Sequence, residues 1–231
     1  RDTDRSRGLG DVYKRQCPAL SRPPSLPAET APGRVDPAGR PLCRQLLELF
    51  PGMFIFAYHR TDKRMKKIIN PWQGVDGYHC YGCDPGHACG LRMEFYEDGE
   101  EVICRWRPRP EYQGWVNTLH GGIQATLADE ISSWVVFRKF QTSGVTSKME
   151  VRYFRPVRTT DAWIDLRARV GEQRRNLVRI DVRIANPDGE LCTQASCTYF
   201  LFPKERARTD FHFSGCDVEE TDSLPAPSGE A

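Results

Sequence analysis

The chain has 231 residues, of which 39% are apolar and 28% are charged, and its 33 basic side chains nearly balance 31 acidic ones. This composition excludes collagen-like, coiled-coil and fully disordered chains, and the length allows one large domain or two small ones. No run of about eighteen consecutive apolar residues occurs, so the sequence predicts no membrane-spanning helix and no membrane partner.

The first 64 residues differ from the rest in charge and composition. They carry 12 basic and 7 acidic side chains, a net charge of +5, and 8 of the 17 prolines, whereas residues 65–231 have a net charge of −3. They show no sustained hydrophobic periodicity, and the first 16 residues resemble a translated adapter sequence. We expect residues 1–64 to be a disordered or non-native extension and Met65 to be the natural start, with a genuine disordered extension as the alternative.

The cysteines predict a reducing environment. There are nine of them, an odd number, and Cys104, Cys192 and Cys197 lie inside apolar runs, where a reduced thiol packs as a small hydrophobic group. No secretory signal pattern follows Met65. We therefore expect a cytoplasmic protein.

A regular pattern begins near Gly90. Apolar and polar residues alternate over 91–96 and again over 102–107, with Gly99 between them, which predicts a β-hairpin. Residues 121–139 contain no proline and are long enough for five helical turns. Apolar side chains cover one side of this predicted helix and small ones the opposite side, so we expect it to be buried.

Four strand-like stretches follow the predicted helix, at residues 144–154, 162–170, 177–185 and 190–202. Two strands, one long helix and four further strands predict an α+β fold in which an antiparallel sheet curls around one helix. We expect residues 65–77 to lead into a domain over 78–204, and residues 205–231 to form a flexible tail.

Two motifs carry a family resemblance. Residues 115–130, WVNTLHGGIQATLADE, and residues 144–156, GVTSKMEVRYFRP, resemble the PaaI-type thioesterases of the hotdog fold, and the resemblance extends over about residues 78–202. It implies a hotdog domain that forms a homodimer, often a dimer of dimers, and that hydrolyses acyl-coenzyme A without a cofactor.

The start of the predicted helix suits the binding of an oxyanion. The N–H groups of a first helical turn have no partner within the helix and stand at the positive end of its dipole. Glycine at 121 and 122 lets a carbonyl oxygen approach this backbone, and the resemblance assigns the oxyanion N–H to Gly121, beside Gly122 in the substrate site. The alternative is that the two glycines only allow tight packing.

Asp129 is the candidate catalytic carboxylate. It follows His120 by nine residues, the family spacing, and the resemblance makes it a nucleophile or a general base. The alternatives are a structural Asp held by neighbouring amides, and the adjacent Glu130 as the catalytic acid. Thr146 matches a family position that holds the nucleophilic water, although it also reads as an ordinary strand residue.

The helix spacing predicts a site shared by two chains. Gly121 and Asp129 are eight residues apart, about 12 Å along one helix, whereas both must lie within about 3 Å of one reacting carbonyl. A two-fold dimer with antiparallel helices would bring Gly121 of one chain beside Asp129 of the other.

Other polar residues near the motifs are candidates for binding the substrate. Members of the family that this chain resembles can carry an Asn six residues before the His, where this chain has Gly114. Because that Asn is missing here, Gln113 and Asn117 are the candidates for polarising the substrate. We expect His120 to orient its loop more than to act as an acid or base.

Three arginines are candidates for binding the phosphates of coenzyme A: Arg155, Arg158 and Arg175.

Residues 79–89, HCYGCDPGHAC, contain the elements of a Cys3His metal site on paper. Only one C-x2-C is present and the ligands are crowded into eleven residues, so we expect no metal here. A lid or packing role for Cys80, Cys83 and Cys89 is the expectation.

Two other functions stay open. A non-catalytic acyl-coenzyme A-binding module would keep the pocket without needing Asp129. A hydratase or dehydratase would need a D-x-N-x-x-H motif, which the sequence lacks. Nucleic-acid binding is disfavoured by the charge of −3 over residues 65–231.

Overall fold

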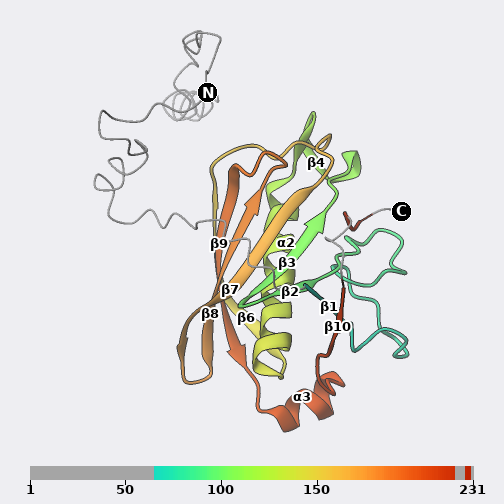
Figure 1. The fold of residues 1–231 in the computed structure, drawn as a ribbon, viewed down its shortest axis with the longest axis vertical. Coiled ribbons are helices and arrows are strands. Elements are labelled where there is room, and N and C mark those ends of the chain that lie inside the picture. The colour runs from blue at the N-terminus through green and yellow to red at the C-terminus, as the bar shows by residue number, and fades with distance from the viewer. Residues whose placement is uncertain (1–64, 222–226, 230–231) are drawn as a thin grey trace, which may run out of the picture. The chain divides into compact units, whose positions relative to one another are not determined.

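One long helix and one large sheet dominate the fold (Figure 1). The computed structural model describes residues 65–221 and 227–229. The expectation for residues 1–64 lies outside these described residues, as does part of the expectation for the tail. Within the described ranges no helix is both long and apolar enough to cross a membrane.

The main sheet has eight antiparallel strands in the order β10-β1-β2-β3-β7-β8-β9-β6. Their bounds are β1 Lys66–Ile68, β2 Tyr96–Asp98, β3 Glu101–Trp106, β6 Gly144–Tyr153, β7 Ile164–Arg174, β8 Leu177–Ala185, β9 Leu191–Leu201 and β10 Val218–Glu220. A separate two-stranded ribbon pairs β4 with β5, and the helical segments are η2, α2, η3 and α3. Their bounds are β4 Gln113–Trp115, β5 Thr118–Leu119, η2 Pro110–Tyr112, α2 Gly121–Val135, η3 Val136–Phe140 and α3 Lys204–Phe211.

Helix α2 is buried, as the sequence predicts, over a wide arc of its surface. Leu127 and Ile131 are fully buried, and so are Ala128 and Ser132, which lie about 100° further round the helix. The helix packs against β3, β6, β7, β8 and β9, so the sheet curls around it (Figure 1). The predicted α+β hotdog architecture is confirmed.

The inner face of the sheet is apolar because of strict alternation along its strands. In β8, Val178, Ile180, Val182 and Ile184 have no exposed surface. The intervening side chains, such as Asp181, stand on the opposite face. The strand over the predicted stretch 177–185 therefore has one buried face and one face turned towards solvent.

The predicted hairpin is present, but its first strand is shorter than the alternation suggests. Leu91 and Met93 are buried as expected, yet their N–H groups donate to the carbonyl oxygens of Tyr81 and Gly82, each at 2.8 Å. Only residues 96–98 pair with β3. The loop that carries Tyr81 and Gly82 thus forms the backbone hydrogen bonds that residues 91–93 would make to a neighbouring strand if the first strand of the hairpin were longer.

The predicted helix over 121–139 changes type near its end. α2 ends at Val135 and continues as a π-helical turn, η3, to Phe140. Arg138 and Lys139 in this turn both contact the carboxylate of Glu97 on β2, at 2.9 and 2.5 Å. These ion pairs lower the pKa of Glu97 against the opposing effect of its burial, and they tie the end of the helix to the sheet.

The C-terminal segment differs from the expected flexible tail over its described residues. α3 follows β9 directly, and β10 pairs with β1 as the edge strand of the main sheet. Phe213 and Cys216, between α3 and β10, are buried with 4% and 0% of their surface exposed. Composition alone suggests a polar tail, but these two side chains complete the core beside Trp72 and Phe137.

Replacing Phe213 by Ala tests whether this segment belongs to the core. Because the ring packs against Trp72 and Phe137, Phe213→Ala should lower the free energy of unfolding by about 3–5 kcal/mol, measured by denaturant titration at fixed protein concentration. The control is Ile69→Ala, whose side chain is 45% exposed and should change it by under about 0.5 kcal/mol. A loss for Phe213→Ala as small as that of the control would contradict the assignment.

Candidate active site

His120 begins α2 as its N-cap residue. Its backbone is extended, with φ −60° and ψ 135°, and its Nδ1 accepts a 2.9 Å hydrogen bond from the N–H of Gly122. The N–H of Gly121 has no acceptor among the described residues. It therefore remains available to a ligand at the positive end of the helix dipole.

The glycines around this turn have different reasons to be glycine. A Cβ on Gly122 or on Gly114 would come within 2.9 Å of the His120 ring, so both positions must be glycine for the ring to fit. A Cβ on Gly121 would make only an ordinary contact of 3.4 Å with the Tyr153 side chain. Packing within the chain explains Gly114 and Gly122, whereas the close approach of a ligand is a better reason for glycine at 121.

Tyr153, at the end of β6, joins the edge of the sheet to the start of α2. Its hydroxyl donates a 2.8 Å hydrogen bond to the carbonyl oxygen of Gly121. The side chain is 51% exposed. The helix start therefore lies beside the free edge of β6.

Asp129 is held by two hydroxyl groups from the sheet. Thr146 Oγ1 donates to its Oδ1 at 2.6 Å, and the Tyr199 hydroxyl donates to the same oxygen at 2.9 Å and to the Asp129 carbonyl oxygen at 2.8 Å. Oδ2 has no hydrogen-bond partner among the described residues. One carboxylate oxygen is thus fixed, and the other is free to act on a ligand.

Thr146 and Tyr199 lie side by side because of the strand register. They are direct cross-strand partners in the β6–β9 pair, and the register shifts between Thr146 and Lys148. Such a bulge redirects side chains locally, and here both hydroxyls meet α2. The pKa of Tyr199 is raised by burial and by the charge of Asp129, which keeps its hydroxyl protonated as a donor.

Sequence reasoning missed Tyr199, although a signal was present. Tyr199 occupies the inward register of β9 with Ala195 and Cys197, and only 2% of it is exposed. A buried tyrosine hydroxyl nearly always finds a polar partner. Its inward position opposite Thr146 therefore pointed to a polar group on the helix.

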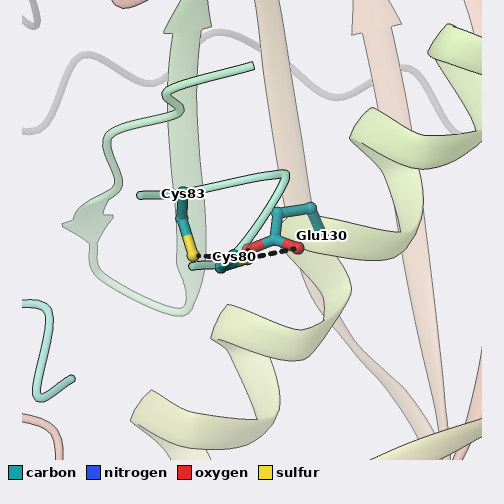
Figure 2. Close-up of side chains that lie close together, drawn as sticks. All are labelled: Cys80, Cys83 and Glu130. Atoms are coloured by element: carbon teal, nitrogen blue, oxygen red, sulfur yellow. Dashed lines mark hydrogen bonds between the residues drawn. The ribbon is translucent and has the colours of Figure 1, made fainter. Parts of the chain in front are cut away.

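Glu130, the alternative acid, lies on another side of the helix. Its carboxylate contacts Cys80 Sγ at 3.6 Å and accepts a 3.1 Å hydrogen bond from Trp134 Nε1. Burial raises its pKa. Figure 2 shows this side chain reaching the loop that carries Cys80 and Cys83. Its hydrogen-bond partners among the described residues do not include Thr146 or Tyr199.

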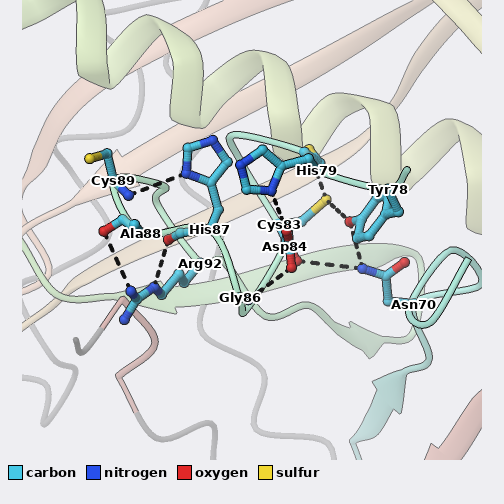
Figure 3. Close-up of polar contacts among 11 residues, drawn as sticks. Asn70, Tyr78, His79, Cys83, Asp84, Gly86, His87, Ala88, Cys89 and Arg92 are labelled. Carbon is cyan, nitrogen blue, oxygen red and sulfur yellow. Dashed lines mark hydrogen bonds and ion pairs between the residues drawn. The ribbon is translucent and has the colours of Figure 1, made fainter. Parts of the chain in front are cut away.

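The four residues that would form a Cys3His site on paper do not come together in the described part of the chain. His79 Nδ1 bonds to Asp84 Oδ2 at 3.0 Å, and its ring stacks on that of His87 with centroids 4.0 Å apart. Cys89 is exposed, and its N–H donates to His87 Nδ1 (Figure 3). Cys80 and Cys83 meet Glu130 instead.

Gln113 and Asn117 lie in the β4–β5 ribbon, close to the start of α2. Gln113 Oε1 accepts from the N–H of Asn117 at 3.3 Å, and Asn117 Oδ1 accepts from Thr159 Oγ1 at 3.2 Å. Asn117 has a positive φ of 55°, which asparagine tolerates in tight turns. The side-chain oxygens of Gln113 and Asn117 thus both accept hydrogen bonds from groups of the chain itself.

The three candidate arginines lie at two ends of the sheet. Arg155 follows β6, where its Nη1 donates to the carbonyl oxygen of Leu191, and Arg158 is nearby on the same loop. Arg175 lies in the β7–β8 turn, next to the strand ends that pair with the start of β6. Because β6 has ten residues and spans about 30 Å, one chain does not bring all three together.

The comparisons with known proteins match the part of the chain that holds this geometry. The sequence profile of the thioesterase superfamily matches residues 116–193. Acyl-coenzyme A thioesterase 13 from Homo sapiens is 31% identical over 103 residues, which cover 44% of this chain and 73% of the relative. The Mus musculus protein of the same name is 29% identical over 104 residues, which cover 44% and 74%.

Among solved structures, a thioesterase superfamily protein aligns with a TM-score of 0.50 and 20% identity over 63% of this chain and 70% of its own. This likeness concerns the fold alone. The human relative exceeds 30% identity over more than two thirds of its own length. The chain therefore belongs to the thioesterase superfamily and is a thioester hydrolase of the hotdog fold.

Proposed function

We propose that the protein hydrolyses acyl-coenzyme A thioesters, with Asp129 as the catalytic carboxylate and the N–H of Gly121 as the oxyanion donor. The observation that carries this proposal is the setting of Asp129. One oxygen is fixed by Thr146 and Tyr199, and the other has no partner among the described residues. The names of the human and mouse relatives support acyl-coenzyme A as the substrate class.

The chemistry requires a nucleophile and a stabilised oxyanion. The free oxygen of Asp129 either removes a proton from an attacking water molecule or attacks the thioester carbonyl itself. In the first case the carbon–sulfur bond breaks, the coenzyme A sulfur takes up the proton that Asp129 removed, and the free acid leaves. In the second case coenzyme A leaves as the thiolate, and water then hydrolyses the acyl–Asp129 anhydride, which releases the acid and restores the carboxylate. The Gly121 N–H, at the positive end of α2, stabilises the negative charge on the carbonyl oxygen. Thr146 acts here by positioning the carboxylate.

Two copies of the chain form this site in the proposal. Gly121 and Asp129 are separated by about 12 Å along α2, too far for one carbonyl to reach both. β6 is the edge strand of the main sheet, and Val145, Met149 and Tyr153 on it are 36–51% exposed. A long exposed edge of this kind suits pairing with a second copy, which would set two α2 helices antiparallel.

The same pairing would also bring the arginines together. With β6 antiparallel to its copy, the start of one strand lies near the end of the other. Arg175 of one copy would then approach Arg155 and Arg158 of the partner subunit, beside the partner's helix start. A cluster of guanidinium groups at this place suits the phosphates of coenzyme A.

Replacing the catalytic carboxylate tests the assignment of Asp129. Asp129→Asn keeps the shape but removes the charge, so kcat should fall by about 100- to 10,000-fold with little change in KM, because the group acts in the transition state. Free-thiol release from a panel of acyl-coenzyme A substrates measures both constants. Asp181→Asn, on the outer face of β8, is the matched control and should keep full activity. Hydrolysis by Asp129→Asn at the wild-type rate would mean that another group is the catalytic one, whereas a wild-type protein that binds acyl-coenzyme A without releasing thiol would favour a binding module.

Removing the buried hydroxyl tests the positioning role of Tyr199. Tyr199→Phe deletes one hydrogen bond to a charged group, worth about 1.5–3 kcal/mol, and kcat should fall about 10- to 100-fold while KM stays constant. Tyr96→Phe, equally buried but bonded to Glu94, controls for the loss of a hydroxyl and should retain its kcat. A change in KM alone would mean that Tyr199 serves substrate binding.

Mixing two inactive variants tests the shared site. Gly121→Val should block the approach of the oxyanion, while its Cβ meets Tyr153 at an ordinary distance, so the chain should fold. After subunit exchange with Asp129→Asn, each heterodimer has one site with both lesions and one with neither. Thiol release should return to about half the wild-type value per heterodimer. Heterodimers that form and stay inactive would place both groups in the site of a single chain.

A further inference from the structure

We propose that Cys80, Cys83 and Glu130 bind one Zn²⁺ ion, which fastens the loop before the hairpin to the middle of α2. The three side chains come from segments about fifty residues apart in the sequence. Their ligand atoms all lie within 4.8 Å of one another, and Figure 2 shows the three side chains close together between the loop and α2. This site is separate from the Asp129 chemistry.

The distances fit a tetrahedral ion. With Zn–S bonds of about 2.3 Å and Zn–O bonds of about 2.1 Å, neighbouring ligand atoms should be about 3.6–3.8 Å apart. Cys80 Sγ lies 3.6 and 3.9 Å from the two oxygens of Glu130, and the two sulfurs lie 3.1 Å apart. The sulfurs need to separate by less than about 1 Å, which a change of side-chain rotamer angle can provide.

Gly82 makes room for the carboxylate between the two cysteines. A Cβ at this position would lie 2.5 Å from Glu130 Oε2 and 2.6 Å from its Cγ. Any other residue would therefore push Glu130 out of the cluster. The C-x-G-C spacing thus has a steric reason that involves the third ligand, and the sequence alone does not reveal it.

The two thiols already lie against each other and against the carboxylate. The Cys83 thiol donates to Cys80 Sγ at 3.1 Å, and the Cys80 thiol donates to Glu130 Oε1 at 3.6 Å. Zinc binds cysteine as the thiolate, so an ion at this place would replace these thiol protons.

Glu130 has an electrostatic reason to bind a cation. The carboxylate lies half-buried among Cys80, Cys83 and Trp134, and no Lys, Arg or His among the described residues forms an ion pair with it. Withdrawing a carboxylate from water without a counter-ion costs free energy. One divalent ion would offset two of the three negative charges that two thiolates and this carboxylate carry.

Neighbouring side chains form an outer shell around the three ligands. Trp134 Nε1 donates to Glu130 Oε1 at 3.1 Å, and the Tyr78 hydroxyl lies 3.0 Å from Cys83 Sγ. Asn70 Nδ2 in turn donates to Tyr78 at 2.8 Å (Figure 3). Such partners fix the orientation of metal ligands. Thiolates with one carboxylate suit Zn²⁺, and a water molecule at the half-buried side of Cys80 completes the tetrahedron.

A disulfide between Cys80 and Cys83 is the competing use of the same sulfurs. It would remove both thiolates and leave Glu130 buried without a counter-ion. The metal therefore accounts for the third member of the cluster, whereas a disulfide does not.

The test uses the untagged full chain, reduced and kept free of oxygen. Titration with Co²⁺ as a spectroscopic probe should saturate at one equivalent, with the thiolate-to-cobalt absorption and the intense visible bands of a tetrahedral site, and Zn²⁺ should displace it. Cys83→Ser should abolish the thiolate absorption, and Glu130→Gln should weaken Co²⁺ binding at least about tenfold. Cys89→Ser, on the same loop but exposed, is the matched control and should bind like wild type.

Thermal unfolding gives a second readout that does not depend on enzymatic activity. Zn²⁺ should raise the midpoint of wild type and Cys89→Ser, but not of Glu130→Gln, since an ion that binds only the folded state stabilises it. Circular dichroism confirms that each variant is folded. The proposal is overturned if folded, reduced wild type gives no thiolate–cobalt bands, if Glu130→Gln binds as tightly as wild type, or if the two sulfurs form a disulfide that persists under reduction.

Discussion

Two consecutive carboxylates in a buried helix set the main constraint on this structure. Asp129 and Glu130 lie in the middle of α2, between residues with no exposed surface such as Ala128 and Ile131. A buried carboxylate needs hydrogen bonds or a cation. Because successive helical residues point about 100° apart, the two groups must be satisfied by different parts of the fold.

The sheet satisfies Asp129, and the loop before the hairpin satisfies Glu130. Thr146 and Tyr199 are cross-strand partners whose hydroxyls meet one oxygen of Asp129. Only β6 and β9, paired in this register, can deliver both. Glu130 instead lies against Gly82, which has no side chain to exclude it. The register of β6 and β9 and the conformation of the loop around Gly82 therefore both serve to accommodate the two carboxylates of α2.

Much of the fold was predictable because it follows from local periodicity. The alternation in β8 and the two apolar sides of α2 specify buried faces directly, and the order of elements then restricts the architecture. The C-terminal segment escaped prediction for a physical reason. Phe213 and Cys216 are isolated apolar residues in a polar stretch, and the Phe213 ring is buried against Trp72 and Phe137, which are distant in sequence and meet it only on folding.

The candidate site was predictable to the extent that motifs are contiguous in sequence. The resemblance pointed to Gly121, Asp129 and Thr146, and the structure brings the last two into contact. Tyr199 and the cluster around Glu130 depend on residues about fifty to seventy positions apart. Rules based on sequence spacing consider candidate ligands within one segment, so they pointed to Cys89 and the histidines as partners of Cys80 and Cys83. In the structure, the third member of the cluster is Glu130, which comes from helix α2.

The free edge of β6 links these local features to the proposed dimer. Tyr153 at its end contacts Gly121 at the start of α2, and Thr146 near its beginning contacts Asp129 eight residues along the same helix. The strand and the helix thus run in opposite directions, with one of the two proposed catalytic groups near each end of β6. In the proposed dimer, a second copy paired antiparallel to β6 would reverse this order, and the helix start of one chain would meet the carboxylate of the other at both ends. The separation of Gly121 from Asp129, an obstacle within one chain, would then give the proposed dimer two equivalent sites.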